Sequence, residues 1–290
     1  MKKITALFLS LFMVLLLVPI GVAEEEPPAP LTTLDLVNQL RENPLVDDIW
    51  VPVLPDRYTI DKVIVYDDGS YCYRIKNNQE NATKIQSIAI MPLTIPMENA
   101  IFNSGYQYYL LEQGISSFPV TQEILDAVVA RKNYTWQNNK RTRLSMTYNF
   151  ARPLTQYQNI PTAHLYYNYT KTVDGDVGIG HNHEMVMGIH PKTIASVVYS
   201  YTPPEGVTSI PQDVFLQTVQ TDMAVQFVTY GDADANGKVD AKDALAILKH
   251  GVNKQPITDE LQQILADYNR DGQIDSKDAL FTLRKAVGKQ

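Results

Sequence analysis

The chain has 290 residues, a formal net charge of −7 and a pI of about 5.2. An acidic protein of this kind is a poor candidate for nucleic-acid binding, which usually requires a basic surface. Apolar residues make up 44% of the chain, enough for a sizeable core, and the single cysteine, Cys72, excludes an intramolecular disulfide. We expect Cys72 to be a buried and unreactive thiol, because its neighbours in sequence would not activate it.

Residues 1–23 have the pattern of a secretory signal peptide. Two lysines precede an apolar run, and Gly21 and Ala23 stand at the small-residue spacing of a cleavage site. We therefore expect a secreted, extracellular protein that is cleaved after Ala23. A membrane contact is expected only if the segment stays uncleaved, since Ile4–Ala23 is nearly long enough to span a bilayer.

Residues 24–45 are interpreted as a linker followed by a short helix. The acidic, proline-rich start EEEPPAP cannot bury enough apolar surface to fold. Residues 31–43 then predict a helix that stops before Pro44, because the residue before a proline is disfavoured in helical conformation.

Residues 46–228 predict a β-rich module of α+β or mainly-β fold, whose function the sequence does not name. The stretch Val63–Ile75 predicts a hairpin, because two β-prone runs flank Asp-Asp-Gly-Ser. Further strands are expected at residues 143–150, 163–170, 177–189 and 194–201, and one helix at Thr121–Lys132.

Tyrosine is unusually frequent in this module, since only Tyr268 of the 17 tyrosines lies beyond residue 230. Flat aromatic faces can stack on sugar rings, so a glycan-binding surface is one interpretation. The other is ordinary strand packing, in which the ring is buried and the hydroxyl stays hydrated.

The stretch GHNHE contains the candidate transition-metal ligands of the module. In a strand, His181 and His183 would share one face and could reach one ion, whereas Glu184 would point to the other face. A third ligand would have to come from His164 or His190. The spacing departs from both the cupin motif and the H-E-x-x-H zinc motif. A polar strand with two surface histidines is therefore the alternative interpretation.

Catalytic carboxylates are not evident in the sequence. Asp174, Asp176 and Glu184 are candidates for glycoside hydrolysis, but nothing pairs them at the separation that this reaction needs. The chain contains no G-x-S-x-G nucleophile motif and no phosphate-binding loop. Whether the module is an enzyme therefore stays open.

The last sixty residues contain an internal repeat with a period of 35 residues. Each copy opens on a loop in which oxygen-bearing side chains alternate, as in a calcium-binding loop of the EF-hand type. Gly237 and Gly272 stand at position 6, where the chain must turn sharply. The expected ligands are Asp232, Asp234, Asn236, the Lys238 carbonyl, Asp240 and Asp243 in the first loop, and Asp267, Asn269, Asp271, the Gln273 carbonyl, Asp275 and Asp278 in the second.

We expect two Ca²⁺ ions, one in each loop, and we expect them to drive the folding of this region. Four carboxylates in each loop would otherwise repel one another, and sixty residues supply little core to oppose that repulsion.

A helix is predicted after each loop, and Thr258 is the expected N-cap of a short helix that links the two repeats. Three apolar residues share one face of each long helix, and we interpret them as core residues. They are Leu245, Leu248 and Val252 in the first helix and Leu280, Leu283 and Val287 in the second.

Residues 231–290 resemble a type I dockerin, because they contain two loop-helix repeats with aspartate at position 12 of each loop. The resemblance implies a small all-α calcium-binding domain with two EF-hand-like repeats. It also implies a partner, a cohesin domain of a scaffoldin or surface protein, and attachment to the cell surface through that cohesin. The recognition positions of the family fall on Ala241, Lys242, Leu248, Lys249, Ser276, Lys277, Leu283 and Arg284.

The recognition positions depart from the family pattern in one respect. The Ser-Thr pair typical of dockerins is replaced by Ala-Lys in the first repeat and Ser-Lys in the second. Leu248 and Leu283 are both candidate recognition residues and candidate core residues. The near symmetry of the repeats suggests that either of them could dock.

Two functions follow from this sequence. In the first, the protein is a secreted component of a cellulosome-like complex, whose central module binds glycan or protein. In the alternative, the module is a hydrolase that acts on the O-glycosyl bonds of a polysaccharide, because dockerins often carry such enzymes. Polysaccharide is thus a candidate partner in both cases.

Overall fold

The structure is a computed structural model. It describes residues 29–288, except 47, 79–82, 101–103, 120, 132, 140–141, 155–159, 191, 202–214, 216 and 218–224. The signal peptide expected for residues 1–23 lies outside the described residues. In the part that is described, no helix is long and apolar enough to cross a membrane.

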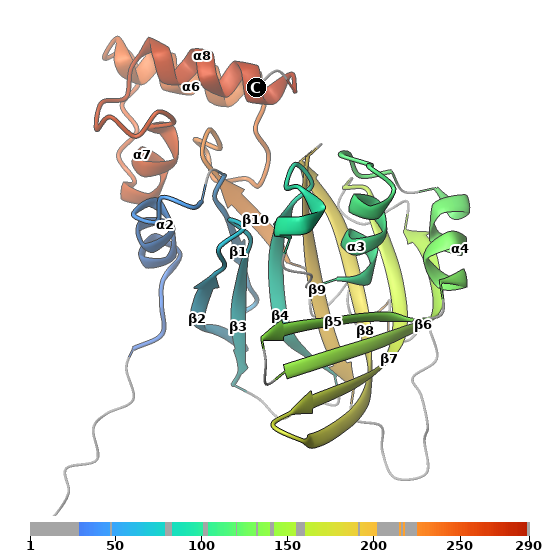
Figure 1. Cartoon of the computed structure of the whole chain (residues 1–290). Coiled ribbons are helices and arrows are strands. Elements are labelled where there is room, and N and C mark those ends of the chain that lie inside the picture. The colour runs from blue at the N-terminus through green and yellow to red at the C-terminus, as the bar shows by residue number, and fades with distance from the viewer. Residues whose placement is uncertain are drawn as a thin grey trace, which may run out of the picture.

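An eight-stranded antiparallel sheet forms the centre of the chain (Figure 1). In spatial order its strands are β2 (Tyr58–Val65), β3 (Tyr71–Asn77), β4 (Thr83–Pro92), β9 (Thr193–Tyr201), β8 (Asp176–His190), β7 (Thr162–Val173), β6 (Thr142–Leu154) and β5 (Tyr134–Asn139). The predicted hairpin is confirmed, because Val65 of β2 pairs with Tyr71 of β3. The four other predicted strands are also confirmed, as β6, β7, β8 and β9.

The longest hairpin joins β7 to β8 through a turn of only two residues. Val173 pairs with Asp176, and both residues between them have positive φ, 52° at Asp174 and 98° at Gly175. An Asp-Gly turn of this kind matches the twist of the flanking strands, so it brings GHNHE into register with β7. His183 consequently faces Tyr166, and His181 faces Asn168.

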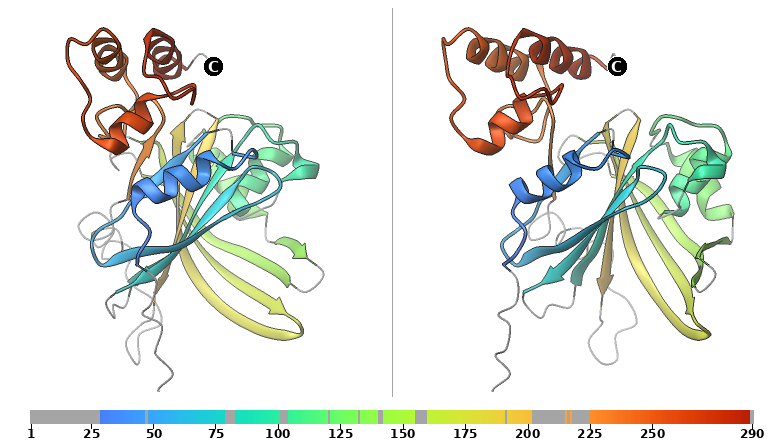
Figure 2. Two further views of the ribbon diagram at one scale, coloured as in Figure 1. Left: turned by 90° about the vertical axis from the view of Figure 1, so that its left-hand side faces the viewer. Right: turned by 60° about the vertical axis from the view of Figure 1, so that its left-hand side comes forward.

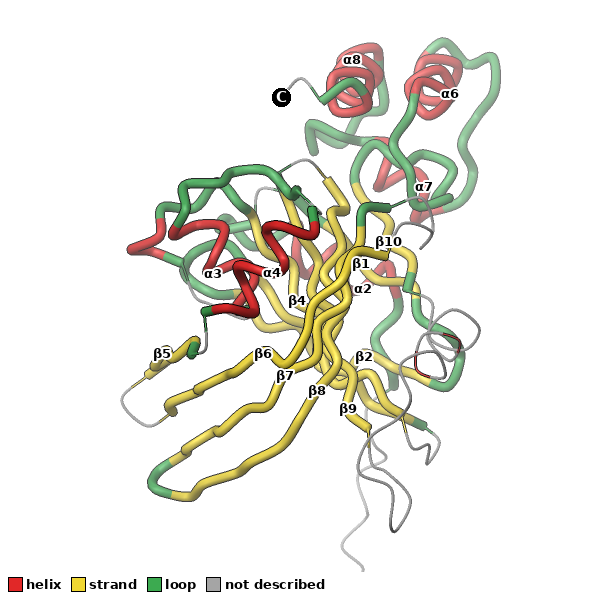
Figure 3. Tube along the Cα trace, turned by 90° about the vertical axis from the view of Figure 1, so that its right-hand side faces the viewer, coloured by secondary structure: helices red, strands yellow, loops and turns green. Residues whose placement is uncertain are grey.

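Helices α3 (Gly105–Glu112) and α4 (Gln122–Ala130) cover one face of the sheet (Figure 3). The helix expected at Thr121–Lys132 is confirmed as α4, with Thr121 as its N-cap. Tyr134, Tyr148 and Tyr167 pack edge to face beneath the helices, with ring centroids 5.4 Å and 5.2 Å apart. For these tyrosines the strand-packing interpretation holds, and Cys72 is buried on the same side.

The other face of the sheet packs against the N-terminal segment, and the C-terminal region lies beyond one end of the sheet, next to that segment (Figure 2). Helix α2 (Thr33–Arg41) ends before Pro44, as predicted, and the short strand β1 (Trp50–Val53) pairs with β10 (Gln226–Thr229). A 3₁₀ turn, η1 (Met97–Asn99), follows β4.

Three helices form the C-terminal region: α6 (Ala241–Gly251), α7 (Glu260–Ala266) and α8 (Ser276–Ala286). Helices α6 and α8 lie side by side (Figure 1). Helix α7 has Asp259 as its N-cap, one residue after the predicted Thr258. A mainly-β module followed by a small all-α region is thus confirmed as the fold class. The two parts share a core, because Leu265 of α7 packs with the buried residues behind the sheet.

Candidate functional site

The first C-terminal loop gathers carboxylates in a way that fits a hard divalent cation. Asp232, Asp234 and Asp243 each offer an oxygen within 4.8 Å of the others. Burial, together with the neighbouring Asp243 and Asp234 charges, raises the pKa of Asp232 to about 7. Burial likewise raises the pKa of Asp243. A bound cation would offset the repulsion among ionised carboxylates held this close, and oxygen ligands suit Ca²⁺.

Backbone N–H groups shape this loop around the carboxylates. Asp232 accepts N–H groups from Asn236 at 3.0 Å and from Gly237 at 2.9 Å. Asp243 accepts those of Asp234 at 3.3 Å and of Asp240 at 2.9 Å. The loop's own backbone therefore holds the side-chain oxygens in place, which is the arrangement that a metal-binding loop needs.

The second loop repeats this hydrogen-bond pattern 35 residues later. Asp267 accepts N–H groups from Asp271 at 3.1 Å and from Gly272 at 3.0 Å. Asp278 accepts two more N–H groups, at 3.0 Å from Asn269 and at 2.9 Å from Asp275. Gly237 and Gly272 have φ of 85° and 83°, the left-handed conformation that position 6 requires. The residues whose backbone carbonyls are predicted ligands, Lys238 and Gln273, directly follow these glycines.

The ligand positions at the end of each loop also begin the helices. Asp240 is the N-cap of α6 and Asp275 is the N-cap of α8. Asp243 and Asp278 complete a capping box at each site. Loop geometry and helix formation are therefore linked, because the same carboxylates serve both.

All eight predicted recognition residues lie at the surface of α6 and α8. Leu248 is 42% exposed and Leu283 is 43% exposed. The others, exposed or half-exposed, are Ala241, Lys242, Lys249, Ser276, Lys277 and Arg284.

The interpretation of the apolar helix faces as core is wrong. All six of these residues are at least 42% exposed: Leu245, Leu248, Val252, Leu280, Leu283 and Val287. Ala244 and Ile247 on α6, with Ala279 and Thr282 on α8, are buried instead. One step along a helix turns the side chain by about 100°, so the true core stripe lies one residue before the predicted one. We call the six exposed residues the apolar stripe.

Two basic residues tie this region to the central module, and sequence reasoning missed both. Lys285 of α8 donates to Asp48 Oδ1 at 2.8 Å and to Thr229 Oγ1 at 2.8 Å. Arg41 of α2 donates to Asp267 Oδ2 at 3.0 Å. Lys285 could have been noticed, because the equivalent residue of the first repeat is His250. No pattern in the sequence marks Arg41.

The structure brings His164, one of the two candidate third ligands, to His183. His164 Nε2 and His183 Nδ1 are 2.9 Å apart, and both rings stack on Phe215. Burial lowers the pKa of His183 to about 4, with a smaller contribution from His181, so the pair is neutral at pH 7. Within the described residues, only one group of three or more His, Cys, Asp or Glu side chains lies close enough together to hold a metal ion. That group is the aspartate group of the first loop.

Glu184 and His190 play no part in this histidine pair. Glu184 points to the opposite face, as predicted, where it accepts hydrogen bonds from Tyr148 at 2.9 Å and Ser196 at 2.7 Å. His190 lies near the C-terminal region, with its ring centroid 6.4 Å from that of Trp50. Asp174 and Asp176 occupy the exposed turn of the β7–β8 hairpin, roughly 30 Å from Glu184 along an extended strand. That separation is too great for a glycosidase pair.

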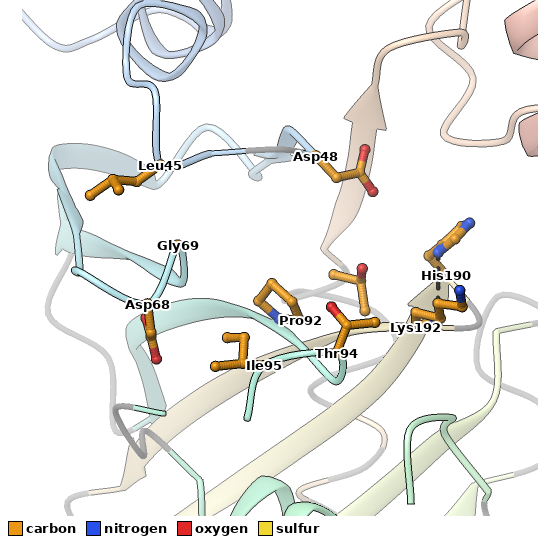
Figure 4. A pocket seen from close by; sticks show the side chains of 10 residues that line it. Leu45, Asp48, Asp68, Gly69, Pro92, Thr94, Ile95, His190 and Lys192 are labelled. Atoms are coloured by element: carbon orange, nitrogen blue, oxygen red, sulfur yellow. Dashed lines mark hydrogen bonds between the residues drawn. The ribbon is translucent and has the colours of Figure 1, made fainter. Parts of the chain in front are cut away.

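A hollow of about 190 Å³ lies beside His190, between Asp48 and Lys192 (Figure 4). Its carboxylates already have structural partners. Asp48 accepts the Lys285 ammonium, and Asp68 accepts the backbone N–H of Ser70 at 2.9 Å. Asp48 and Asp68 are therefore held in place by neighbouring groups of the chain.

Comparison with known proteins assigns the C-terminal region. Residues 230–285 match the family of the dockerin type I domain. No curated protein and no solved structure matches the chain. Domains of this family bind calcium and a cohesin partner in extracellular complexes of the cellulosome type. The C-terminal region is therefore a type I dockerin domain, and it makes the protein a component of a cohesin–dockerin complex.

Proposed function

We propose that this protein is a secreted component of a cell-surface complex, docked to a cohesin through α6 and α8, with one Ca²⁺ ion in each dockerin loop. The apolar stripe is the observation that carries the proposal. Six large apolar side chains at equivalent positions of both repeats are exposed to solvent. Such a patch on a soluble domain marks a protein-binding surface.

The two repeats offer alternative docking surfaces. Leu248 of α6 and Leu283 of α8 are exposed to almost the same extent, 42% and 43%. A basic residue follows each of them, Lys249 and Arg284. A cohesin that recognises one repeat should therefore also accept the dockerin turned by half a rotation.

Cohesin binding by Leu248→Asp, Leu283→Asp and the double variant tests this proposal. Calorimetry against a type I cohesin should show binding by each single variant and a loss of at least 100-fold in the double variant. Ile179→Asp is the matched control, because Ile179 is exposed but lies on β8 of the central module. Complete loss in one single variant would exclude the second surface. Unchanged binding by the double variant would exclude the apolar stripe.

For the central module, the proposed activity is glycan binding on the face of β6 and β7 that faces away from α3 and α4. Phe150 and Tyr166 are half-exposed there, and their rings stack with centroids 5.7 Å apart. Asn168 is exposed beside them, with half-exposed Thr147 opposite it. Aromatic faces flanked by amide and hydroxyl groups offer stacking and hydrogen bonding together, the two interactions that a sugar ring requires.

A glycan array probed with the full mature chain tests this activity. Tyr166→Ala should abolish the signal, whereas Tyr169→Ala, on the opposite face of β7, should retain it. Equal signals from both variants would exclude this surface. If the chain bound a protein and no glycan, the partner of this surface would be a protein. A polysaccharide hydrolase panel run on the same samples tests the alternative function, which the release of reducing sugar would support.

A further inference from the structure

The two dockerin loops differ in one contact with the N-terminal helix α2. Arg41 Nη2 lies 3.0 Å from Asp267 Oδ2, and the two side chains are 27% and 6% exposed. Asp267 is position 1 of the second loop, and Arg41 is in the last turn of α2, 226 residues earlier. In the first loop, the side chain of Asp232 accepts hydrogen bonds from backbone N–H groups of its own loop.

The two loops also differ in their nearby cations, because the second contains Arg270 and has Lys277 Nζ 4.0 Å from Asp271 and 3.9 Å from Asp275. In their carboxylates and the N–H groups that hold them, the two loops are alike. Each contains four aspartates at its ligand positions, and each binds its position-1 and position-12 carboxylates by the same four N–H groups. Ligand charge therefore does not distinguish them, although the number of charged ligands is what usually tunes the affinity of such loops.

We propose that Arg41 makes the two calcium sites unequal, by lowering the affinity of the second loop through its ion pair with Asp267. This inference rests on the proposed binding of one ion per loop. The guanidinium neutralises part of the carboxylate charge, so the ion-free loop is less strained and a cation gains less on entering it. Arg41 engages one carboxylate oxygen, while the other accepts the Asp271 N–H at 3.1 Å, so the contact weakens calcium binding without blocking it.

The coupling acts in both directions. If Arg41 lowers the affinity for calcium, then calcium in the second loop must weaken the contact between α2 and the dockerin by the same factor. One unit charge about 5 Å from a doubly charged ion corresponds to a change in affinity of at least roughly tenfold. Lys285 and Asp48, which are not ligands, keep the dockerin attached whichever state the loop is in.

Calorimetric titration of the full mature chain with Ca²⁺ tests the inference. An Asp243→Asn background disables the first loop, so that the titration reports the second. Arg41→Gln should tighten that second site by at least roughly tenfold. Arg41→Lys should keep a wild-type affinity, because it retains the charge. Arg143→Gln, at an exposed position on β6, is the control for the loss of one positive charge.

An unchanged or weaker affinity in Arg41→Gln would overturn the inference alone. If neither protein bound Ca²⁺ at the second loop, the proposal of two ions would fail as well. Should Asp243→Asn not fold, the same comparison on the otherwise unaltered chain, fitted to two sites, decides the question. In that two-site fit, Arg41→Gln must raise the calcium affinity of the weaker site and leave the affinity of the stronger site unchanged.

Discussion

Lys285 and Asp48 form an ion pair, with 2.8 Å between Nζ and Oδ1, that joins the last helix of the dockerin to the segment before β1. The Lys285 side chain is only 2% exposed, and its ammonium also lies 4.7 Å from the centre of the Trp50 ring. The Tyr230 carbonyl accepts a further hydrogen bond from it at 3.2 Å. The dockerin is thus packed against the central module, and it does not hang from a linker.

Replacement of Lys285 by methionine should therefore destabilise the whole chain. Asp48 would lose its cationic partner and the Tyr230 carbonyl would lose a buried donor, so we expect the free energy of unfolding to fall by about 2–4 kcal/mol. Urea denaturation followed by circular dichroism measures this change. Lys254→Met, at an exposed position after α6, is the control and should change stability by less than about 0.5 kcal/mol. A comparable loss in both variants would show that burial of Lys285 is not the cause.

Calcium removal should unfold α6 and α8 before the sheet. Asp243 and Asp278 are both proposed calcium ligands and observed capping residues, so repulsion in an ion-free loop would act directly on the start of each helix. Excess EDTA should reduce ellipticity at 222 nm, and Ca²⁺ at 100 times its dissociation constant should restore about 2.7 kcal/mol of stability per site. Asp259→Asn, which alters the non-ligand N-cap of α7, should leave this response intact. A spectrum indifferent to EDTA would contradict calcium-driven folding.

Much of the site was predictable because it depends on local chemistry. The alternation of oxygen-bearing residues specifies the loops, and Asp-Gly at 174–175 specifies the hairpin that sets the register of β7 and β8. The two faces of β8 follow from a period of two, so Glu184 could be placed opposite His183 from the sequence alone.

Contacts between segments that are distant in the sequence could not be predicted. His164 and His190 were both candidates to join His183, and the sequence could not choose between them, since the pairing depends on the β7–β8 register and on Phe215. Arg41 and Asp267 are 226 residues apart. The apolar stripe was misjudged for another reason. A leucine pattern at helical spacing marks an apolar face, and only the packing of α6 on α8 shows whether that face is buried.

Acid should destabilise the central module through the histidine pair. Burial holds the pKa of His183 at about 4 and that of His164 at about 2, both below the usual 6.5. The unfolded chain therefore takes up protons below pH 6.5 while the folded chain does not. Stability is fully present above pH 6.5 and falls as the pH drops toward 4, by at most about 1.4 kcal/mol per pH unit for each histidine.

In the variant His183→Gln, stability should fall less steeply as the pH drops, because unfolding takes up about one proton fewer. Urea denaturation at pH 7, 6 and 5 measures the slope, with His181→Gln, on the same strand face, as the control. The raised pKa of Glu184 acts in the opposite direction, and a comparison of the two variants at equal pH removes its contribution. Equal slopes in the variant and the control would show that His183 is not the acid-sensitive group.

Glu184 should prove structural when its two substitutions are compared. Glu184→Ala leaves the Tyr148 and Ser196 hydroxyls without their acceptor in a buried site, so we expect it to lower stability by about 2–4 kcal/mol. Glu184→Gln retains an acceptor and places no charge in a site where burial raises the pKa of the carboxyl group, so it should stay within about 1 kcal/mol of the wild type. Thermal denaturation compares the three proteins, and the hydrolase panel is applied to the stable glutamine variant. A stable Glu184→Gln protein that had lost a polysaccharide-degrading activity of the wild type would identify Glu184 as part of an active site and reverse this assignment.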